Sequence, residues 1–168
     1  MKPVYLCGFM GCGKSHIGRL LAKELKAEFV DLDRYIVDKE GMTIPEIFEK
    51  KGELYFRDIE ARFIKNFSGR TIVATGGGAM LRDETAQFAR EVGTVFFLDV
   101  SFDTCYSRIK NDKNRPLVVN NSKEQLCAIF DKRFPVYKKN SDYAIDGERT
   151  DKEIARDIID ILKEKGRI

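Results

Sequence analysis

Short apolar runs alternate with longer amphipathic segments along most of this chain. The runs are nearly continuous in hydrophobic residues, which is typical of strands that helices cover on both faces. The five runs are Val4–Cys7, Glu28–Asp31, Thr71–Thr75, Thr94–Asp99 and Asp142–Ile145. Because strands that alternate with helices indicate βαβ units, the pattern predicts a three-layer α/β domain around a five-stranded parallel sheet.

The segments between these runs have helical periodicity. In the first, apolar residues from Ile17 to Leu25 recur at the spacing of one helix face. The second is expected to break near Gly52, and the last opens with the capping-box pattern Thr150-Asp151-Lys152-Glu153. The predicted helices are Lys14–Lys26, Thr43–Phe67, Asp83–Glu91, Phe102–Lys110, Ser122–Lys139 and Thr150–Lys165.

One polar segment, residues 110–121, lacks clear periodicity. Long irregular segments in compact domains often act as lids over a site, so we expect a lid there. No internal repeat or linker-like stretch divides the chain, and 168 residues fit one domain, which we place at residues 1–168.

Composition excludes several classes of protein. Hydrophobic residues make up 43% and charged residues 34% of the chain, as in soluble globular proteins. The net charge of +3 is too small for a nucleic-acid-binding face, and no apolar run approaches the roughly 18–20 residues of a membrane helix. We therefore expect a cytoplasmic protein, a monomer, with neither nucleic acid nor membrane as a partner.

The cysteines and the single histidine exclude further kinds of site. The four cysteines show no Cys-x-x-Cys pair, so we expect free thiols in a reducing compartment. One histidine, His16, cannot form a two-histidine zinc site. A Ser-His-Asp hydrolase would have to be built around this residue, which lies beside a glycine-rich segment.

That segment, Gly8–Ser15, fits the pattern G-x-x-x-x-G-K-[ST] between a predicted strand and a predicted helix. Glycines allow successive backbone N–H groups to point at phosphate oxygens, and the helix N-terminus adds partial positive charge. Lys14 is expected to reach the β- and γ-phosphates, and the Ser15 hydroxyl can ligate Mg²⁺. The alternative is a glycine turn followed by a chance Lys-Ser, but the structural context favours binding of MgATP.

Two carboxylates, Asp31 and Asp33, stand at the end of the second predicted strand. Alternation along an extended chain would place both on one face, and parallel sheets bind ligands at the carboxyl ends of their strands. One carboxylate can hold the Mg²⁺ shell while the other receives a proton from an acceptor hydroxyl. The alternative is a solvated turn in which Asp33 caps a helix.

Further motifs follow in a fixed order. They are Gly52-Glu53-Leu54-Tyr55-Phe56-Arg57-Asp58-Ile59-Glu60, Thr75-Gly76-Gly77-Gly78, Arg115-Pro116-Leu117 and Arg133-Phe134-Pro135-Val136-Tyr137. With the glycine-rich loop and Asp31-Leu32-Asp33, the set resembles the shikimate kinase family nearly from end to end. The resemblance implies a P-loop NTPase fold like that of nucleoside monophosphate kinases. It also implies transfer of the γ-phosphoryl group of ATP, with Mg²⁺, to the 3-hydroxyl of shikimate, in aromatic amino-acid (chorismate) biosynthesis.

The resemblance implies roles for individual residues. Catalytic residues would be Lys14, Asp33 and Arg115, with Asp33 as base or orienting group. ATP would be bound by Gly11, Cys12, Gly13, Lys14, Ser15, His16, Arg108, Arg115 and Arg149, and the metal by Ser15 and Asp31. Shikimate would be bound by Asp33, Arg57, Gly77, Gly78 and Arg133, with Glu60 orienting Arg57 and an acceptor-binding region at residues 33–60.

The chemistry of such an acceptor agrees with these residue types. A small polyhydroxy acid needs a planar, bidentate partner for its carboxylate, which arginine supplies. Arg57 and Glu60 lie three residues apart on one helix face, so the acid can fix the guanidinium. The triple glycine at Gly76–Gly78 would expose bare backbone N–H groups. The alternatives are a surface ion pair, a tight turn, a solvated helix arginine at Arg133 and a charged loop tip at Arg115.

Three other functions remain open at this point. A related P-loop kinase could act on gluconate or a nucleoside monophosphate, although a nucleotide would bring further phosphate contacts. A nucleotide-binding module without transferase activity would lack Lys14 or the carboxylate pair, and both are present. An oligomeric NTPase motor would need an acidic residue at the end of Thr71–Thr75, which has none.

Overall fold

The computed structural model describes residues 1–168 and contains one five-stranded sheet, with strand order β2-β3-β1-β4-β5 and every pair parallel. The strands are β1 (Val4–Cys7), β2 (Glu28–Asp31), β3 (Thr71–Ala74), β4 (Thr94–Asp99) and β5 (Tyr143–Asp146). The predicted fold class is confirmed. Three strands have the predicted bounds, β3 is one residue shorter, and β5 is shifted by one residue.

The shift of β5 has a local cause at Asp142. Its backbone N–H donates to the carbonyl of Val95 (2.8 Å), while its carboxylate accepts from the N–H of Val95 (2.8 Å) and pairs with Arg90 (2.9 Å). Because the side chain of Asp142 accepts from the N–H of Val95, the backbone pairing of β5 with β4 begins at the next residue, Tyr143.

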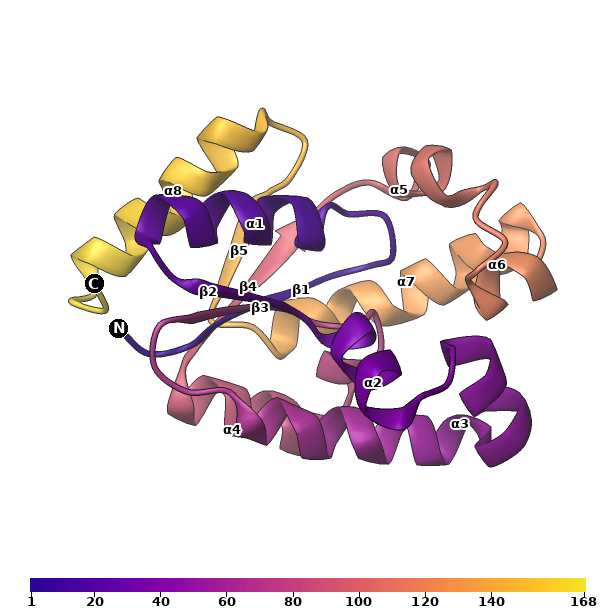
Figure 1. Cartoon of the computed structure of the whole chain (residues 1–168). Coiled ribbons are helices and arrows are strands. Elements are labelled where there is room, and N and C mark those ends of the chain that lie inside the picture. The colour runs from indigo at the N-terminus through magenta and orange to yellow at the C-terminus, as the bar shows by residue number, and fades with distance from the viewer.

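Helices cover both faces of the sheet. They are α1 (Lys14–Leu25), α2 (Leu32–Glu40), α3 (Ile44–Phe63), α4 (Asp83–Val92), α5 (Phe102–Ile109), α6 (Pro116–Asn120), α7 (Lys123–Lys139) and α8 (Asp151–Glu164), with short 3₁₀ turns η1 (Ile64–Asn66) and η2 (Ala79–Leu81). In Figure 1, α1 and α8 lie on one side of the strands and α3 and α4 on the other. None of these helices is long and apolar enough to cross a membrane.

The sequence analysis missed α2, and this corrects the argument about the carboxylates. Strand β2 ends at Asp31, whose side chain caps the new helix by accepting from the N–H of Arg34 (3.3 Å). Asp33 therefore lies in the first turn of a helix and not on an extended strand. Both the alternation argument and the alternative of a cap at Asp33 were wrong. The signal for the helix was the pair Leu32 and Ile36, which are one turn apart and fully buried.

Two other segments refine the predicted pattern. Gly52 does break α3, with φ 83° and ψ 167°, and the rest of the predicted segment continues as η1. Residues 110–121 were expected to be irregular, but they contain the short helix α6, which starts at Pro116. Proline fixes φ near the helical value and lacks an N–H that the first turn would leave unpaired, so it favours a helix start.

The core lies on both faces of β1, whose four residues are all 0% exposed, and it forms one cluster of 35 buried residues. Gly18 brings α1 close to the sheet, because a Cβ at this position would lie 2.5 Å from the ring of Phe29. The loop after β1 leads to α1, and the loop after β3 leads toward α4 on the opposite face (Figure 1). Loops that diverge in this way open a crevice at the carboxyl ends of the strands.

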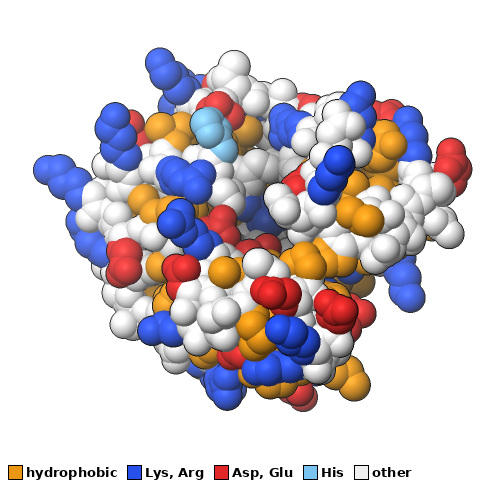
Figure 2. All heavy atoms as spheres, turned by 45° about the vertical axis from the view of Figure 1, so that its right-hand side comes forward, with side chains coloured by type: hydrophobic (Ala, Val, Ile, Leu, Met, Phe, Trp, Pro, Cys, Tyr) orange, Lys and Arg blue, Asp and Glu red, His pale blue; other side chains and the backbone are white.

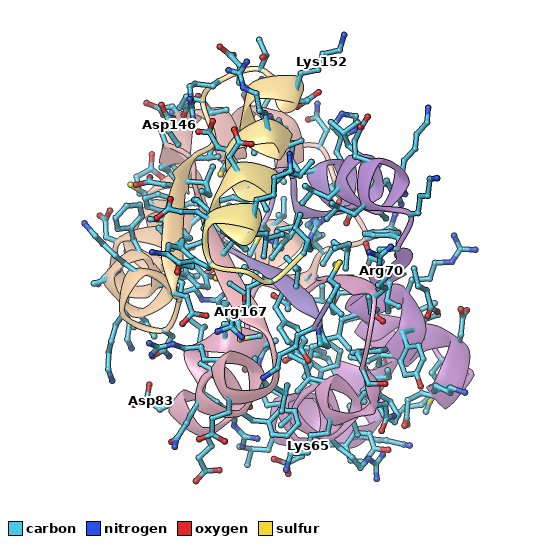
Figure 3. The ribbon with its side chains drawn as sticks, turned by 90° about the vertical axis from the view of Figure 1, so that its left-hand side faces the viewer. Lys65, Arg70, Asp83, Asp146, Lys152 and Arg167 are labelled. Atoms are coloured by element: carbon cyan, nitrogen blue, oxygen red, sulfur yellow. The ribbon has the colours of Figure 1, made fainter.

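Figure 3 shows the molecule from the side on which the two termini lie. In this view the exposed cations Lys65, Arg70 and Lys152 lie apart from one another, and Lys152 is in the first turn of α8, at the end of that helix away from the C-terminus (Figure 3). These three cations therefore form no common patch, which agrees with the interleaved charges of the sequence.

Candidate active site

The loop between β1 and α1 curls around the side chain of Lys14. Its Nζ donates to the carbonyl oxygens of Gly8 (2.8 Å) and Phe9 (3.0 Å). Gly11 has φ 82°, and a Cβ there would lie 2.7 Å from the backbone oxygen of Cys105, so only glycine fits. The guanidinium of Arg108, from α5, donates to the Gly11 carbonyl (3.0 Å). The ammonium, a second cation and the N-terminus of α1 therefore meet at one point, which suits a polyphosphate.

The predicted metal ligands are in direct contact. The Ser15 hydroxyl donates to Oδ2 of Asp31 at 2.5 Å, which joins the start of α1 to the end of β2. No group of three or more His, Cys, Asp or Glu side chains could hold a metal ion by itself. Mg²⁺ is usually bound by one or two protein oxygens together with substrate phosphates and water, so this pair fits Mg²⁺ that arrives with a nucleotide.

Two cavities meet beside Asp33. The phosphate cavity, about 580 Å³, is lined by the loop after β1, by Arg108 and by further cations that include Arg19 and Arg34. The acceptor cavity, about 230 Å³, lies between α3, the 110–117 segment and α7. Asp33, Gly77 and Arg115 line both. Figure 2 shows this hollowed face, with Lys and Arg side chains and the single histidine around it.

Opposing charges act on Asp33 at this junction. Burial and the neighbouring Asp31 raise the pKa of the Asp33 carboxyl, whereas Lys14, Arg115 and Arg57 lower it. Arg115 is held by Asp112, whose Oδ2 accepts from Nε at 2.9 Å. A carboxylate at the meeting point of two cavities and three cations can accept a proton from one ligand while the cations bind the other.

The polar wall of the acceptor cavity is formed by Arg57, Glu60 and Arg133. Arg57 donates to Oε2 of Glu60 at 2.6 Å and approaches Glu53 at 3.3 Å. The Glu60 side chain is 1% exposed, and its Oε1 has no hydrogen-bond donor. Burial raises the pKa of Glu60 to about 7, although Arg57 opposes the rise. The expected ion pair is thus present and buried, so it is no surface pair.

The triple glycine fits between these side chains. A Cβ on Gly76 would lie 2.5 Å from Oε1 of Glu60 and 2.6 Å from Oδ1 of Asp33, and one on Gly78 would overlap the Arg57 guanidinium. A Cβ on Gly77 would meet nothing closer than 3.8 Å. The N–H groups of Gly77 and Gly78 donate to no acceptor within the chain. Both Gly77 and Gly78 line the acceptor cavity, so the segment has unpaired backbone donors at its wall.

The side chains of three predicted ATP-binding residues are buried or paired with other side chains. Cys12 is 3% exposed, and its Sγ lies 3.6 Å from the Lys14 ammonium. His16 lines the phosphate cavity, but its Nε2 lies 2.8 Å from Asp151 on α8. Arg149 pairs with Asp157 and approaches Asp146 at 3.8 Å, and it lines neither cavity.

Sequence reasoning missed the apolar wall of the acceptor cavity. Its members come from the loop after β1, from α3 and from the segment at α6: Met10, Ile44, Phe48, Phe56, Pro116 and Leu117. The rings of Phe48 and Phe56 lie on either side of the Gly52 kink, with centroids 5.0 Å apart. The available signal was two aromatic residues flanking a glycine that was already expected to bend the helix.

Comparison with known proteins gives a consistent result. A family model described as shikimate kinase matches residues 10–163. The shikimate kinase of Thermodesulfovibrio yellowstonii is 44% identical over 163 residues, covering 95% of this chain and 94% of the relative. That of Staphylococcus haemolyticus is 38% identical over 162 residues, covering 96% and 94%.

Solved structures agree over the same length. Shikimate kinase from Acinetobacter baumannii in complex with shikimate has a TM-score of 0.91 and 34% identity, covering 98% of this chain and 94% of that one. Deoxyadenosine kinase from M. mycoides has a TM-score of 0.64 and 19% identity, covering 96% and 99%, and this likeness concerns the fold alone.

Proposed function

Because this chain belongs to the shikimate kinase family, we propose that it transfers the γ-phosphoryl group of ATP to the 3-hydroxyl of shikimate. Family membership makes it an ATP-dependent kinase that acts on shikimate. The position of the reacting hydroxyl and the roles of individual residues are what the proposal adds. The observation that carries these roles is the junction of two cavities at Asp33.

In the phosphate cavity, the N-terminus of α1 and the cations Lys14 and Arg108 bind the phosphates of ATP. Ser15 and Asp31 would hold Mg²⁺, which neutralises charge on the β- and γ-phosphates when it is bound. The Lys14 ammonium donates to two loop carbonyls, and it would exchange these hydrogen bonds for bonds to phosphate oxygens when ATP binds. This side of the site supplies charge stabilisation, which is most of what phosphoryl transfer requires from a protein.

In the acceptor cavity, Arg57 and Arg133 bind the carboxylate of the acceptor together with the N–H groups of Gly77 and Gly78. Glu60 holds the Arg57 guanidinium in one orientation. The apolar wall takes the carbon ring, and Asp33 orients the hydroxyl and accepts its proton as the phosphoryl group moves.

The segment at residues 110–121 acts as a lid within a single domain at residues 1–168, and residues 33–60 form the acceptor-binding region. Arg115 belongs to the lid and lines both cavities, so lid movement changes charge at the reacting phosphoryl group and the access of water. Both cavities are built within one chain, which supports a monomer. The free cysteines, three of them buried, support a reducing, cytoplasmic location.

Release of ADP from MgATP by the purified protein tests the proposal. Shikimate, quinate, gluconate, CMP and no acceptor are compared under the same conditions. We expect strong release with shikimate alone. Equal release with quinate would contradict the assignment of shikimate as the specific acceptor. Release with CMP would favour a nucleotide kinase. No acceptor-dependent release would contradict kinase function.

A further inference from the structure

The proposed function assigns nothing to Tyr137, the last residue of the R-x-x-x-Y segment on α7. Its side chain is buried, with the residue 1% exposed, and its ring stacks on Phe97 with centroids 5.7 Å apart and planes 27° apart. The hydroxyl donates a short hydrogen bond to the carbonyl oxygen of Gly77. A buried hydroxyl on a ring held by stacking has little freedom, so the Gly77 carbonyl is held with it.

That hydrogen bond orients one peptide group of the triple-glycine segment. The carbonyl oxygens of Gly76 and Gly78 accept from the N–H groups of Ala79 (3.2 Å) and Leu81 (3.1 Å), whereas the Gly77 carbonyl accepts from the side chain of Tyr137. In a trans peptide the N–H points away from the preceding C=O. Holding the Gly77 carbonyl toward α7 therefore aims the N–H of Gly78 in the opposite direction. Glycine permits many backbone conformations, so without this contact the donor would not be fixed.

The same helix brings Arg133 to this peptide. Arg133 and Tyr137 are four residues apart, on one face of α7. A Cβ built on Gly77 would lie 3.9 Å from the Arg133 guanidinium and 3.9 Å from the Tyr137 hydroxyl. Burial raises the pKa of Tyr137, and the charge of Arg133 only opposes this in part, so the hydroxyl remains a donor at neutral pH.

We propose that Tyr137 is a positioning residue for acceptor binding, which locks the Gly77–Gly78 peptide to α7 so that its free N–H and the Arg133 guanidinium face the same carboxylate. This inference rests on the proposed function for the identity of the acceptor. It adds a specific claim, that one hydroxyl outside the acceptor's reach fixes the backbone donor that contacts the acceptor beside Arg133. Tyr137 itself lines neither cavity.

The test compares Tyr137→Phe with Tyr5→Phe. Both substitutions remove one hydroxyl from a buried tyrosine, but Tyr5 lies in β1, is 0% exposed, and has a hydroxyl with no hydrogen-bond partner. For Tyr137→Phe we expect the KM for shikimate to rise about tenfold, as for loss of one well-placed hydrogen bond, with kcat and the KM for ATP within about twofold of the parent. Tyr5→Phe should change neither KM. An unchanged shikimate KM in Tyr137→Phe, or an equal rise in both KM values, would overturn the proposal.

A second measurement does not depend on catalysis. Amide hydrogen exchange of Thr75 and Ala79, whose N–H groups donate to the carbonyls of Leu6 and Gly76, is followed in the parent and both variants without substrates. We expect faster exchange in Tyr137→Phe alone, since its Gly77 carbonyl loses the partner that holds the segment. Equal exchange in all three proteins would contradict the positioning role even if turnover had changed. If the parent shows no shikimate-dependent turnover, the proposed function fails, and exchange still decides whether Tyr137 holds the peptide.

Discussion

At the scale of single residues, the acceptor cavity depends on charges that are buried and paired. Arg57 is 17% exposed in its side chain, and Glu60 behind it is 1% exposed. Removing one member of such a pair leaves the other as an uncompensated buried charge, which costs far more than the net value of the pair. The two members therefore have distinct and measurable roles.

Arg57→Ala should raise the KM for shikimate by roughly 100-fold and the KM for ATP by much less, because the substitution removes a hydrogen-bonded partner of the carboxylate. Steady-state kinetics with each substrate varied in turn measures the difference. Arg62→Ala is the matched control on the same helix, since the Arg62 side chain is 64% exposed and its one ion pair, with Glu40, is long at 4.0 Å. An equal effect of Arg57→Ala on both substrates would place Arg57 outside the acceptor site.

Glu60→Gln tests the buried carboxyl. Burial raises the pKa of Glu60 to about 7 in the folded protein, above its value of 4.5 in the unfolded chain. The folded state therefore binds the proton more tightly, and the resulting stability is present below about pH 4.5 and is lost as the pH rises through 7. Glutamine cannot ionise, so the Tm of Glu60→Gln relative to the parent should rise by roughly 3–8 °C between pH 5 and 8. Melting curves with the same pH dependence in both proteins would contradict a raised pKa.

At the scale of elements, the sequence predicted local features better than relationships between elements. The position of Lys14 and Ser15 at the start of α1 was predicted correctly, because the loop, the strand before it and the helix after it are contiguous in the chain. Asp33 was placed by strand alternation, which was wrong, because Leu32 and Ile36 draw the following residues into α2. The ring pair Phe48 and Phe56 was missed because its position depends on the direction of the kink in α3.

That kink can be tested at Gly52. Its φ of 83° is unfavourable for other residues, although a Cβ there would meet no atom within 4 Å, so any effect of Gly52→Ala comes from backbone strain and not from a clash. We expect about 1–3 kcal/mol of lost stability and a higher KM for shikimate, because the two rings on either side of the kink move apart. Thermal unfolding and kinetics measure both. A normal shikimate KM in a destabilised protein would show that the kink does not shape the cavity.

At the scale of the whole molecule, the sheet order explains why two cavities meet. The chain leaves β1 toward one face and β3 toward the other, so the carboxyl ends of these neighbouring strands lie at an open crevice. The start of α1, the start of α2 and the triple glycine after β3 all reach this point. The fold class followed from the sequence pattern, but the meeting of both cavities at Asp33 depends on packing between distant segments, which no spacing in the chain reveals.

The most direct test of this account is turnover and binding by Asp33→Asn. Asparagine keeps the size and one oxygen of the side chain but cannot accept the proton, so we expect binding of ATP and shikimate within a few-fold of the parent and kcat lower by about 100-fold or more. Asp38→Asn, on the exposed face of the same helix, is the matched control and should leave kcat unchanged. A kcat near that of the parent in Asp33→Asn would contradict the claim that the two substrates react at the junction beside this carboxylate.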